Sequence, residues 1–217
     1  MPVVSGTMRS RMGFAVQHLM AAANFSRQCC AVEKKHIGEP IDYFFDEIKY
    51  CSTASILFSV ASLEAHINEL FFEHSSSFPN HSENLIKRTF EAIEKASILK
   101  KYQMALSLRG AEDFDIGKDN SFKATEVLIR LRNALVHFKP EWEDDQKKHK
   151  TISDSLRGRF EMSPFIEKHA PIFPKKFMSY GCSKWAVNTA TKFLAAFHEK
   201  ADIPNKFEIF EDTLKLE

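Results

Sequence analysis

The chain has 217 residues, of which 44% are hydrophobic and 12% aromatic, so it is long enough to bury one substantial core. Its 30 Lys and Arg residues are balanced by 29 Asp and Glu residues. The resulting formal net charge of +1 excludes the global basic field that draws many proteins to nucleic acid or anionic lipid, so any contact with a polyanion must be local.

The composition also indicates the compartment. The four cysteines form no Cys-x-x-Cys pair, and a disulfide between the adjacent Cys29 and Cys30 would strain the backbone. We therefore expect reduced thiols in a soluble, cytoplasmic protein. Polar residues interrupt the apolar sequence near the start of the chain, which argues against a signal peptide or a membrane span, so we expect no association with a membrane.

Gly and Pro are scarce and fall between long stretches in which apolar residues recur every three or four positions. This periodicity predicts an all-α protein, a single helical-bundle domain over residues 1–217 with its core at about 41–199. Residues 140–179 contain four prolines, which predicts an irregular connection with short helical pieces before the last helix. Five long helices are predicted, at roughly residues 7–35, 41–74, 82–108, 121–138 and 182–199.

The second predicted helix is the most apolar and has two polar features. Glu64 and Asn68, one turn apart, fall inside an apolar arc, where a carboxylate is costly unless a cation meets it. We therefore predict that Glu64 or Asn68 contacts Arg132 of the fourth predicted helix. The other feature is a stripe of small side chains that would let another helix approach closely, formed by Ser52, Ser55, Ser59 and Ser62.

The fourth predicted helix must stop near Lys139, because Pro140 follows. A narrow second apolar ridge, formed by Ile129 and Val136, lies well away from its main apolar stripe. A solvated face would not need this ridge, so we expect the helix to pack against a second copy of the chain as well as into its own core. The main stripe, expected in the core, is formed by Leu128, Leu131, Leu135 and Phe138.

Polar side chains flank this second ridge. Arg132 lies on one side of it, and Asn133 and His137, which are close enough to contact one another, lie on the other. An ion pair of Arg132 with Glu64 could also serve only to fix helix register. His137 taken alone would more often cap a helix end or form a hydrogen bond in a core.

Other positions give weaker signals. The remaining histidines have no HExxH or paired-ligand spacing, so no metal site and no cofactor are expected. Lysine clusters could line an RNA path, although such clusters are more often solvated surface. They are Lys100 with Lys101, Lys147 and Lys148 with Lys150, and Lys175 with Lys176.

The segment Arg132-Asn133-x-x-x-His137 resembles the R-x4-6-H motif of the HEPN superfamily, whose catalytic members usually carry a polar residue directly after the arginine. The resemblance to uncharacterised bacterial HEPN-like proteins extends over about residues 50–197. It includes the segment Glu64-Ala-His-Ile-Asn68-Glu-Leu-Phe and the later segment Ser183-Lys-Trp185-Ala186.

The resemblance implies an α-helical bundle that dimerises so that two motifs face a shared cleft. Many HEPN proteins are metal-independent endoribonucleases of toxin-antitoxin, antiphage or stress-response systems, whereas others are inactive and bind nucleotides or protein partners. Carried over to this chain, Arg132 and His137 would be the catalytic pair and Asn133 the polar third member. Glu64 and Asn68 would support them.

These side chains suit RNA cleavage by the neighbouring 2′-hydroxyl. An imidazole with a pKa near 6.5 can act as base or acid, and a guanidinium matches phosphate oxygens. We expect a homodimeric endoribonuclease whose partners are RNA and, in a toxin-antitoxin setting, an antitoxin protein. The alternatives are an inactive HEPN module, which the near-neutral charge favours, and a purely structural helical domain.

Overall fold

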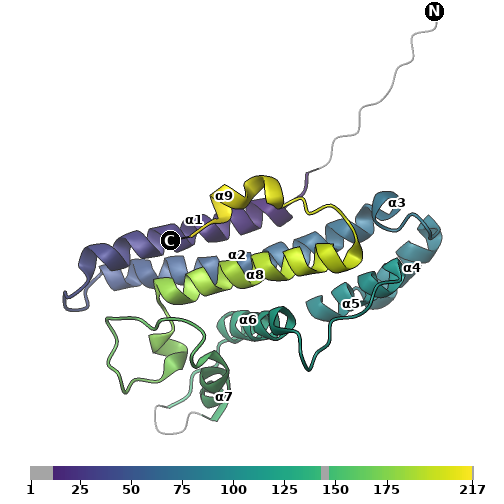
Figure 1. Cartoon of the computed structure of the whole chain (residues 1–217). Coiled ribbons are helices and arrows are strands. Elements are labelled where there is room, and N and C mark those ends of the chain that lie inside the picture. The colour runs from purple at the N-terminus through teal and green to yellow at the C-terminus, as the bar shows by residue number, and fades with distance from the viewer. Residues whose placement is uncertain (1–11, 143–146, 217) are drawn as a thin grey trace, which may run out of the picture.

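Three long helices form one layer of the protein. The computed structural model describes residues 12–142 and 147–216, which contain helices and connections and no strand. Helices α1 (Ala15–His36), α2 (Phe44–Phe72) and α8 (Tyr180–Ala201) lie side by side along the length of the molecule (Figure 1). The predicted all-α class is confirmed.

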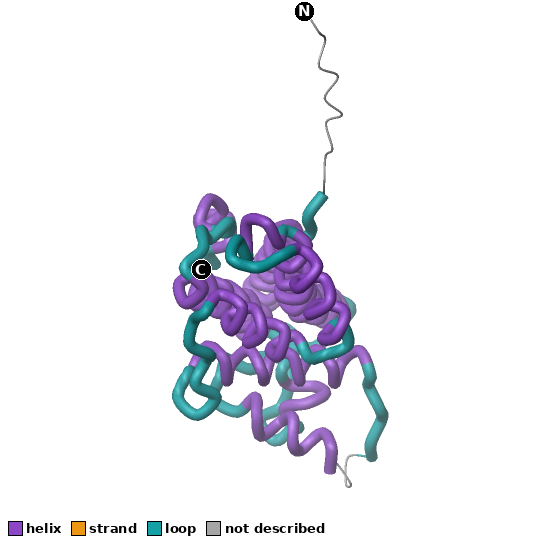
Figure 2. The backbone as a smooth tube through the Cα atoms, turned by 90° about the vertical axis from the view of Figure 1, so that its right-hand side faces the viewer, coloured by secondary structure: helices purple, strands orange, loops and turns teal. Residues whose placement is uncertain are grey.

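The other helices lie around this layer. Helix α6 (Asn120–Val136) crosses α8 and α2 on one face, and Figure 2 shows the long helices nearly end-on above this second layer. The remaining elements are α3 (His74–Ser77), α4 (Glu83–Ile93), α5 (Ile98–Arg109), α7 (Lys147–Leu156), the distorted turn η1 (Ile172–Lys176), the short turn η2 (Glu208–Phe210) and α9 (Glu211–Leu214).

The prediction of one continuous helix over residues 82–108 is wrong, because the chain forms two helices there. The chain leaves the helix after Ile93, and the hydroxyl of Ser97 accepts a hydrogen bond from the backbone N–H of Lys100, which caps the start of α5. No Gly or Pro marks this break in the sequence. The first helix begins at Ala15 in the described residues, and residues 7–11 of its predicted range lie outside them.

The predicted serine stripe lies between α1 and α2. The hydroxyls of Ser55 and Ser62 donate to the carbonyl oxygens of Ala22 and Ala15, at 3.0 and 2.7 Å. These bonds reach the backbone of α1 directly, which is possible because neither side of the contact carries a bulky side chain. All four serines of the stripe are buried, so the expected close approach of a second helix is confirmed.

A buried polar chain connects α2, α5 and α8. The Tyr102 hydroxyl donates to the Leu63 carbonyl oxygen at 2.9 Å, so it accepts from Nδ1 of His66, also at 2.9 Å. Nε2 of His66 must then accept from Nε2 of His198, 3.0 Å away. This assignment leaves the His66 imidazole neutral. Burial lowers the pKa of both imidazoles, that of His198 to about 4, so His198 is also neutral at neutral pH.

All four cysteines are buried, and none of them forms a disulfide. Burial raises the pKa of the Cys29 and Cys182 thiols above the ordinary value, so these two side chains stay in the thiol form. In the described part of the chain, no helix is both long enough and apolar enough to cross a membrane.

Candidate functional site

The candidate site lies at the C-terminal end of α6. The helix begins where the Asp119 carboxylate accepts hydrogen bonds from the backbone N–H groups of Ser121 and Phe122, at 2.9 and 3.0 Å. It ends at Val136, and the backbone N–H of His137 donates to the Asn133 carbonyl oxygen at 2.9 Å. The candidate residues therefore occupy the last helical turns.

Two of the four residues predicted for the core stripe of α6 are fully buried. Leu128 and Leu131 lie in the core, and Leu135 is partly buried against it. Phe138 was predicted in the same stripe, but its side chain is 47% exposed. The backbone leaves the helix at His137, so Phe138 no longer follows the helical spacing, and its ring stacks on that of His149 instead.

The predicted contact between α2 and α6 is present. Nη2 of Arg132 donates to Oε2 of Glu64 at 3.3 Å. The prediction that apolar side chains surround Glu64 is wrong, because its side chain is 47% exposed. The side chain of Arg132 is 23% exposed. The pair lies at the solvent edge of the helix contact, and it is therefore not the buried ion pair that a pure register role assumes.

Asn68 serves a different contact from the one predicted. Its side-chain oxygen accepts a hydrogen bond at 3.3 Å from Nζ of Lys101, a residue of α5 that is 4% exposed. The Lys101 ammonium also lies 5.5 Å from the centre of the Phe90 ring. Asn68 thus satisfies a nearly buried cation between α2 and α5, and it does not contact Arg132.

His137 and Asn133 are exposed to solvent. Among the described residues, no hydrogen bond joins their side chains, and only the backbone bond connects them. His137 lines a hollow of about 280 Å³ between α6 and α7, with the buried Phe173 ring also in its wall. The hollow is also lined by Arg130, Lys139, Lys148 and His149. Arg130 pairs with Glu126 at 2.9 Å, and Nδ1 of His149 lies 3.9 Å from Oε2 of Glu141.

Glu141 connects the segment that follows α6 to the start of α7, next to this hollow. Its carboxylate accepts hydrogen bonds from the backbone N–H groups of Lys148 and His149 at the start of α7, at 3.2 and 3.0 Å. The N–H of His149 in particular keeps the pKa of Glu141 below its ordinary value. Nε2 of His149 is 3.0 Å from the Lys139 carbonyl oxygen. These bonds fix α7 against the segment that follows His137.

Arg132 is not among the residues that line this hollow. Five positions along an α-helix correspond to a rotation of about 140°, so the guanidinium extends toward α2 while the imidazole lies toward α7. Within one copy of the chain, the structure therefore brings Arg132 to Glu64 but does not bring Arg132 to His137.

The sequence analysis named Lys148 in a lysine cluster that could line an RNA path, but it placed neither this residue nor the other basic residues beside His137. Arg130 is seven positions before His137 and so lies on the same helix face, which was a readable signal. Lys148 and His149 arrive from α7, and nothing in their own sequence indicates that neighbourhood. Within residues 12–142 and 147–216, no group of three or more His, Cys, Asp or Glu side chains is arranged to hold a metal ion.

No protein-family model matches the chain, and comparisons with curated proteins and with solved structures likewise find no match.

Proposed function

We propose that the protein is an endoribonuclease of HEPN type that cleaves RNA at the C-terminal end of α6. The observation that carries the proposal is the contact of Arg132 together with the exposure of Asn133 and His137. Arg132 is held in place by Glu64, while Asn133 and His137 are open to solvent beside a hollow lined by basic side chains. A purely structural helix end does not need a paired guanidinium and an exposed imidazole beside Lys139 and Lys148.

The residues suit the chemistry of 2′-hydroxyl attack. The 2′-oxygen forms a bond to phosphorus as the bond from phosphorus to the 5′-oxygen breaks. One group takes the proton of the 2′-hydroxyl, and another gives a proton to the leaving 5′-oxygen, so the products are a 2′,3′-cyclic phosphate and a 5′-hydroxyl. An imidazole serves either step at neutral pH, and Arg132 stabilises the charge on the phosphate.

One histidine cannot perform both proton transfers in a single step, so the proposal includes a homodimer. The α6 surface supports it, because Val136 is 53% exposed beside Asn133 and His137, and Ile129 is only partly buried. An exposed aliphatic side chain next to the candidate site suits contact with the same surface of a second copy. The second copy then supplies the second imidazole.

An inactive binding module is the competing function. The separation of Arg132 and His137 within one copy favours this function. The hollow next to His137 could also hold a phosphate group without any cleavage.

The test is incubation of the purified protein with an end-labelled single-stranded RNA in EDTA. The proposal predicts cleavage without divalent metal, fragments that end in 2′,3′-cyclic phosphate, and no cleavage where the attacking nucleotide is 2′-deoxy. Binding of intact RNA with no such fragments, for the dimer as for the monomer, would favour the binding module.

A further inference from the structure

A hollow of about 680 Å³ lies where α8 faces the start of α6, at the opposite end of α6 from His137. Its volume falls within the roughly 300–1,000 Å³ of pockets that bind small molecules. Its walls are formed by residues 120–124 of α6, residues 159–161 of the connection that follows α7, and residues 180–192, mostly of α8. The three motif residues of α6 do not line it, so it is separate from the candidate site described above.

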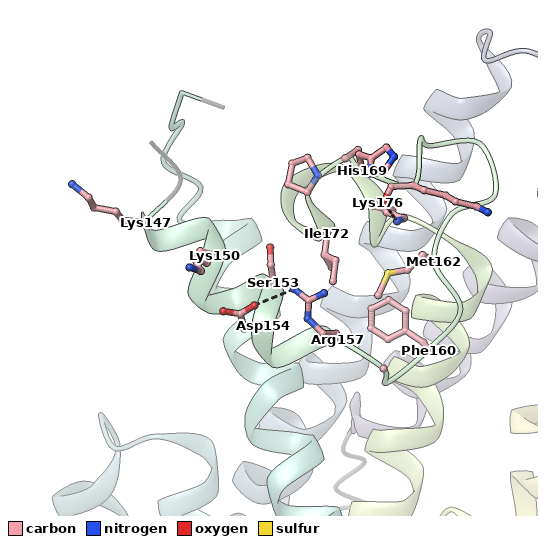
Figure 3. A pocket seen from close by; sticks show the side chains of 14 residues that line it. Lys147, Lys150, Ser153, Asp154, Arg157, Phe160, Met162, His169, Ile172 and Lys176 are labelled. Atoms are coloured by element: carbon pink, nitrogen blue, oxygen red, sulfur yellow. Dashed lines mark hydrogen bonds and ion pairs between the residues drawn. The ribbon is translucent and has the colours of Figure 1, made fainter. Parts of the chain in front are cut away.

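Two aromatic side chains meet in this hollow. The ring centres of Phe160 and Trp185 are 5.4 Å apart, and both side chains are partly exposed. Phe160 also lies at one end of a neighbouring hollow of about 780 Å³ between α7 and η1, as Figure 3 shows. The accessible part of the Trp185 indole gives a flat apolar surface on which a planar ring can stack.

A nearly buried hydroxyl in the wall has no hydrogen-bond partner. Thr189 is 6% exposed, and its hydroxyl forms no hydrogen bond within the described residues. Thr125 and Thr191 differ, since each donates to the carbonyl oxygen four residues earlier, at 2.8 and 2.9 Å. That bond is the ordinary one for a threonine inside a helix. An unpaired hydroxyl at a nearly buried position is costly, and a ligand in the hollow would satisfy it.

Amide side chains line two facing walls. Asn120 belongs to the start of α6, and Asn188 lies on α8 one turn after Trp185. Neither amide forms a hydrogen bond with another described residue. A side-chain amide can donate and accept at once, and this combination matches the N6 and N7 edge of adenine.

Side chains of both charges line the hollow, so charge alone does not select its ligand. The carboxylate is that of Glu161, and the basic side chains are those of Arg159, Lys184 and Lys192. A ligand recognised by a planar ring and by hydrogen bonds fits this wall without carrying a charge of its own.

We propose that this hollow binds an adenine nucleoside. The base stacks on the Trp185 indole, and its polar edge forms hydrogen bonds with the Asn188 amide and the Thr189 hydroxyl. The Asn120 amide lies across the hollow on α6 and is available to the rest of the nucleoside. This binding does not depend on the proposed cleavage of RNA.

The experiment titrates the full chain carrying Trp142→Phe with adenosine. Trp142 is 84% exposed, and its replacement leaves Trp185 as the only tryptophan. We expect saturable quenching of the Trp185 fluorescence as the base stacks on the indole. Guanosine and cytidine should bind at least about fivefold more weakly, because their edges do not match an asparagine amide in the same way.

Two threonines of α8 give a matched pair of variants. Thr189→Val should raise the Kd for adenosine by about threefold or more, because the base loses a hydrogen bond. It should not lower the free energy of unfolding, because the hydroxyl of Thr189 has no partner in the fold. Thr191→Val is the control, since Thr191 does not line the hollow, and it should leave the Kd unchanged.

An asparagine pair tests the amide in the same way. Asn188→Ala should raise the Kd by about fivefold or more, because a bidentate contact with the base is lost. The control Asn24→Ala changes an exposed asparagine of α1 and should bind adenosine like the wild type. Circular dichroism of all variants checks that they are folded.

The outcomes separate this inference from the proposed function. Absence of saturable quenching by adenosine, or equal Kd values for Thr189→Val and Thr191→Val, would overturn the inference. Equal binding of adenosine, guanosine and cytidine would overturn the assignment to adenine. Cleavage of RNA by a wild type that does not bind adenosine would reject the inference and retain the proposed function, and the opposite result would retain the inference alone.

Discussion

Replacement of Arg132 by Ala separates a structural role of this residue from a functional one. Its ion pair with Glu64 is a single contact of 3.3 Å in which the carboxylate is 47% exposed. Pairs of this kind are screened by solvent and contribute about 0.2–1 kcal/mol, so we expect the free energy of unfolding to fall by no more than about 1 kcal/mol. Urea unfolding followed by circular dichroism measures this change.

The effect on RNA cleavage should be far larger. A positioned donor that stabilises charge in the transition state typically contributes about 10²- to 10³-fold to kcat, or about 3–4 kcal/mol. We therefore expect Arg132→Ala to lose at least about 10²-fold in kcat while it remains folded. The matched control is Arg88→Ala, an exposed arginine of α4, which should leave both quantities unchanged. Undiminished cleavage by Arg132→Ala, or an activity loss that only follows the unfolded fraction, would refute this reasoning.

Three further predictions concern the surroundings of the site and the core. Glu64→Gln should lower kcat less than Arg132→Ala does, because Glu64 acts only by positioning the guanidinium. For the same reason the double variant should have the same kcat as Arg132→Ala alone, and additive losses of kcat would contradict this. The free energy of unfolding should fall as the pH drops from about 6.5 toward 4, because the unfolded imidazoles bind protons in this range while those of His66 and His198 in the folded protein do not. His198 alone accounts for about 3 kcal/mol of this loss by pH 4, measurable by urea unfolding at a series of pH values, and a flat profile would contradict the neutral pair. Gly181→Ala should destabilise the fold by about 1–3 kcal/mol, because an added Cβ would lie 2.3 Å from the backbone oxygen of Glu161, and an unchanged thermal midpoint would argue against this packing.

Periodicity was sufficient to predict the all-α class and most of the long helices, although not the break between α4 and α5. The spacing of Leu128 and Leu131 placed the core face of α6 correctly. The contact of Arg132 with Glu64 follows from the prediction that Glu64 lies among apolar side chains; the contact is present, although the Glu64 side chain is half exposed. The spacing failed at Phe138, since a helical pattern does not show where the backbone leaves the helix.

Tertiary contacts account for the remaining errors. Asn68 binds Lys101 because α5 docks against α2, and the sequence of neither helix encodes that docking visibly. The break before Ser97 lacks any Gly or Pro, so only the capping hydroxyl marks it. Lys150 and Lys176 belong to separate segments that fold around one hollow; the sequence shows each of them within a lysine cluster, but not that the two clusters meet.

The proposed cleavage depends most on the His137 imidazole at the end of α6, and the rate at which the protein cleaves RNA in EDTA tests this role most directly. The comparison is between the wild type, His137→Ala and His74→Ala, a matched histidine variant on α3 that should cleave at the wild-type rate. The account predicts that His137→Ala is slower by about 10²- to 10⁴-fold, with the same circular dichroism spectrum. Cleavage by His137→Ala at the wild-type rate would contradict it.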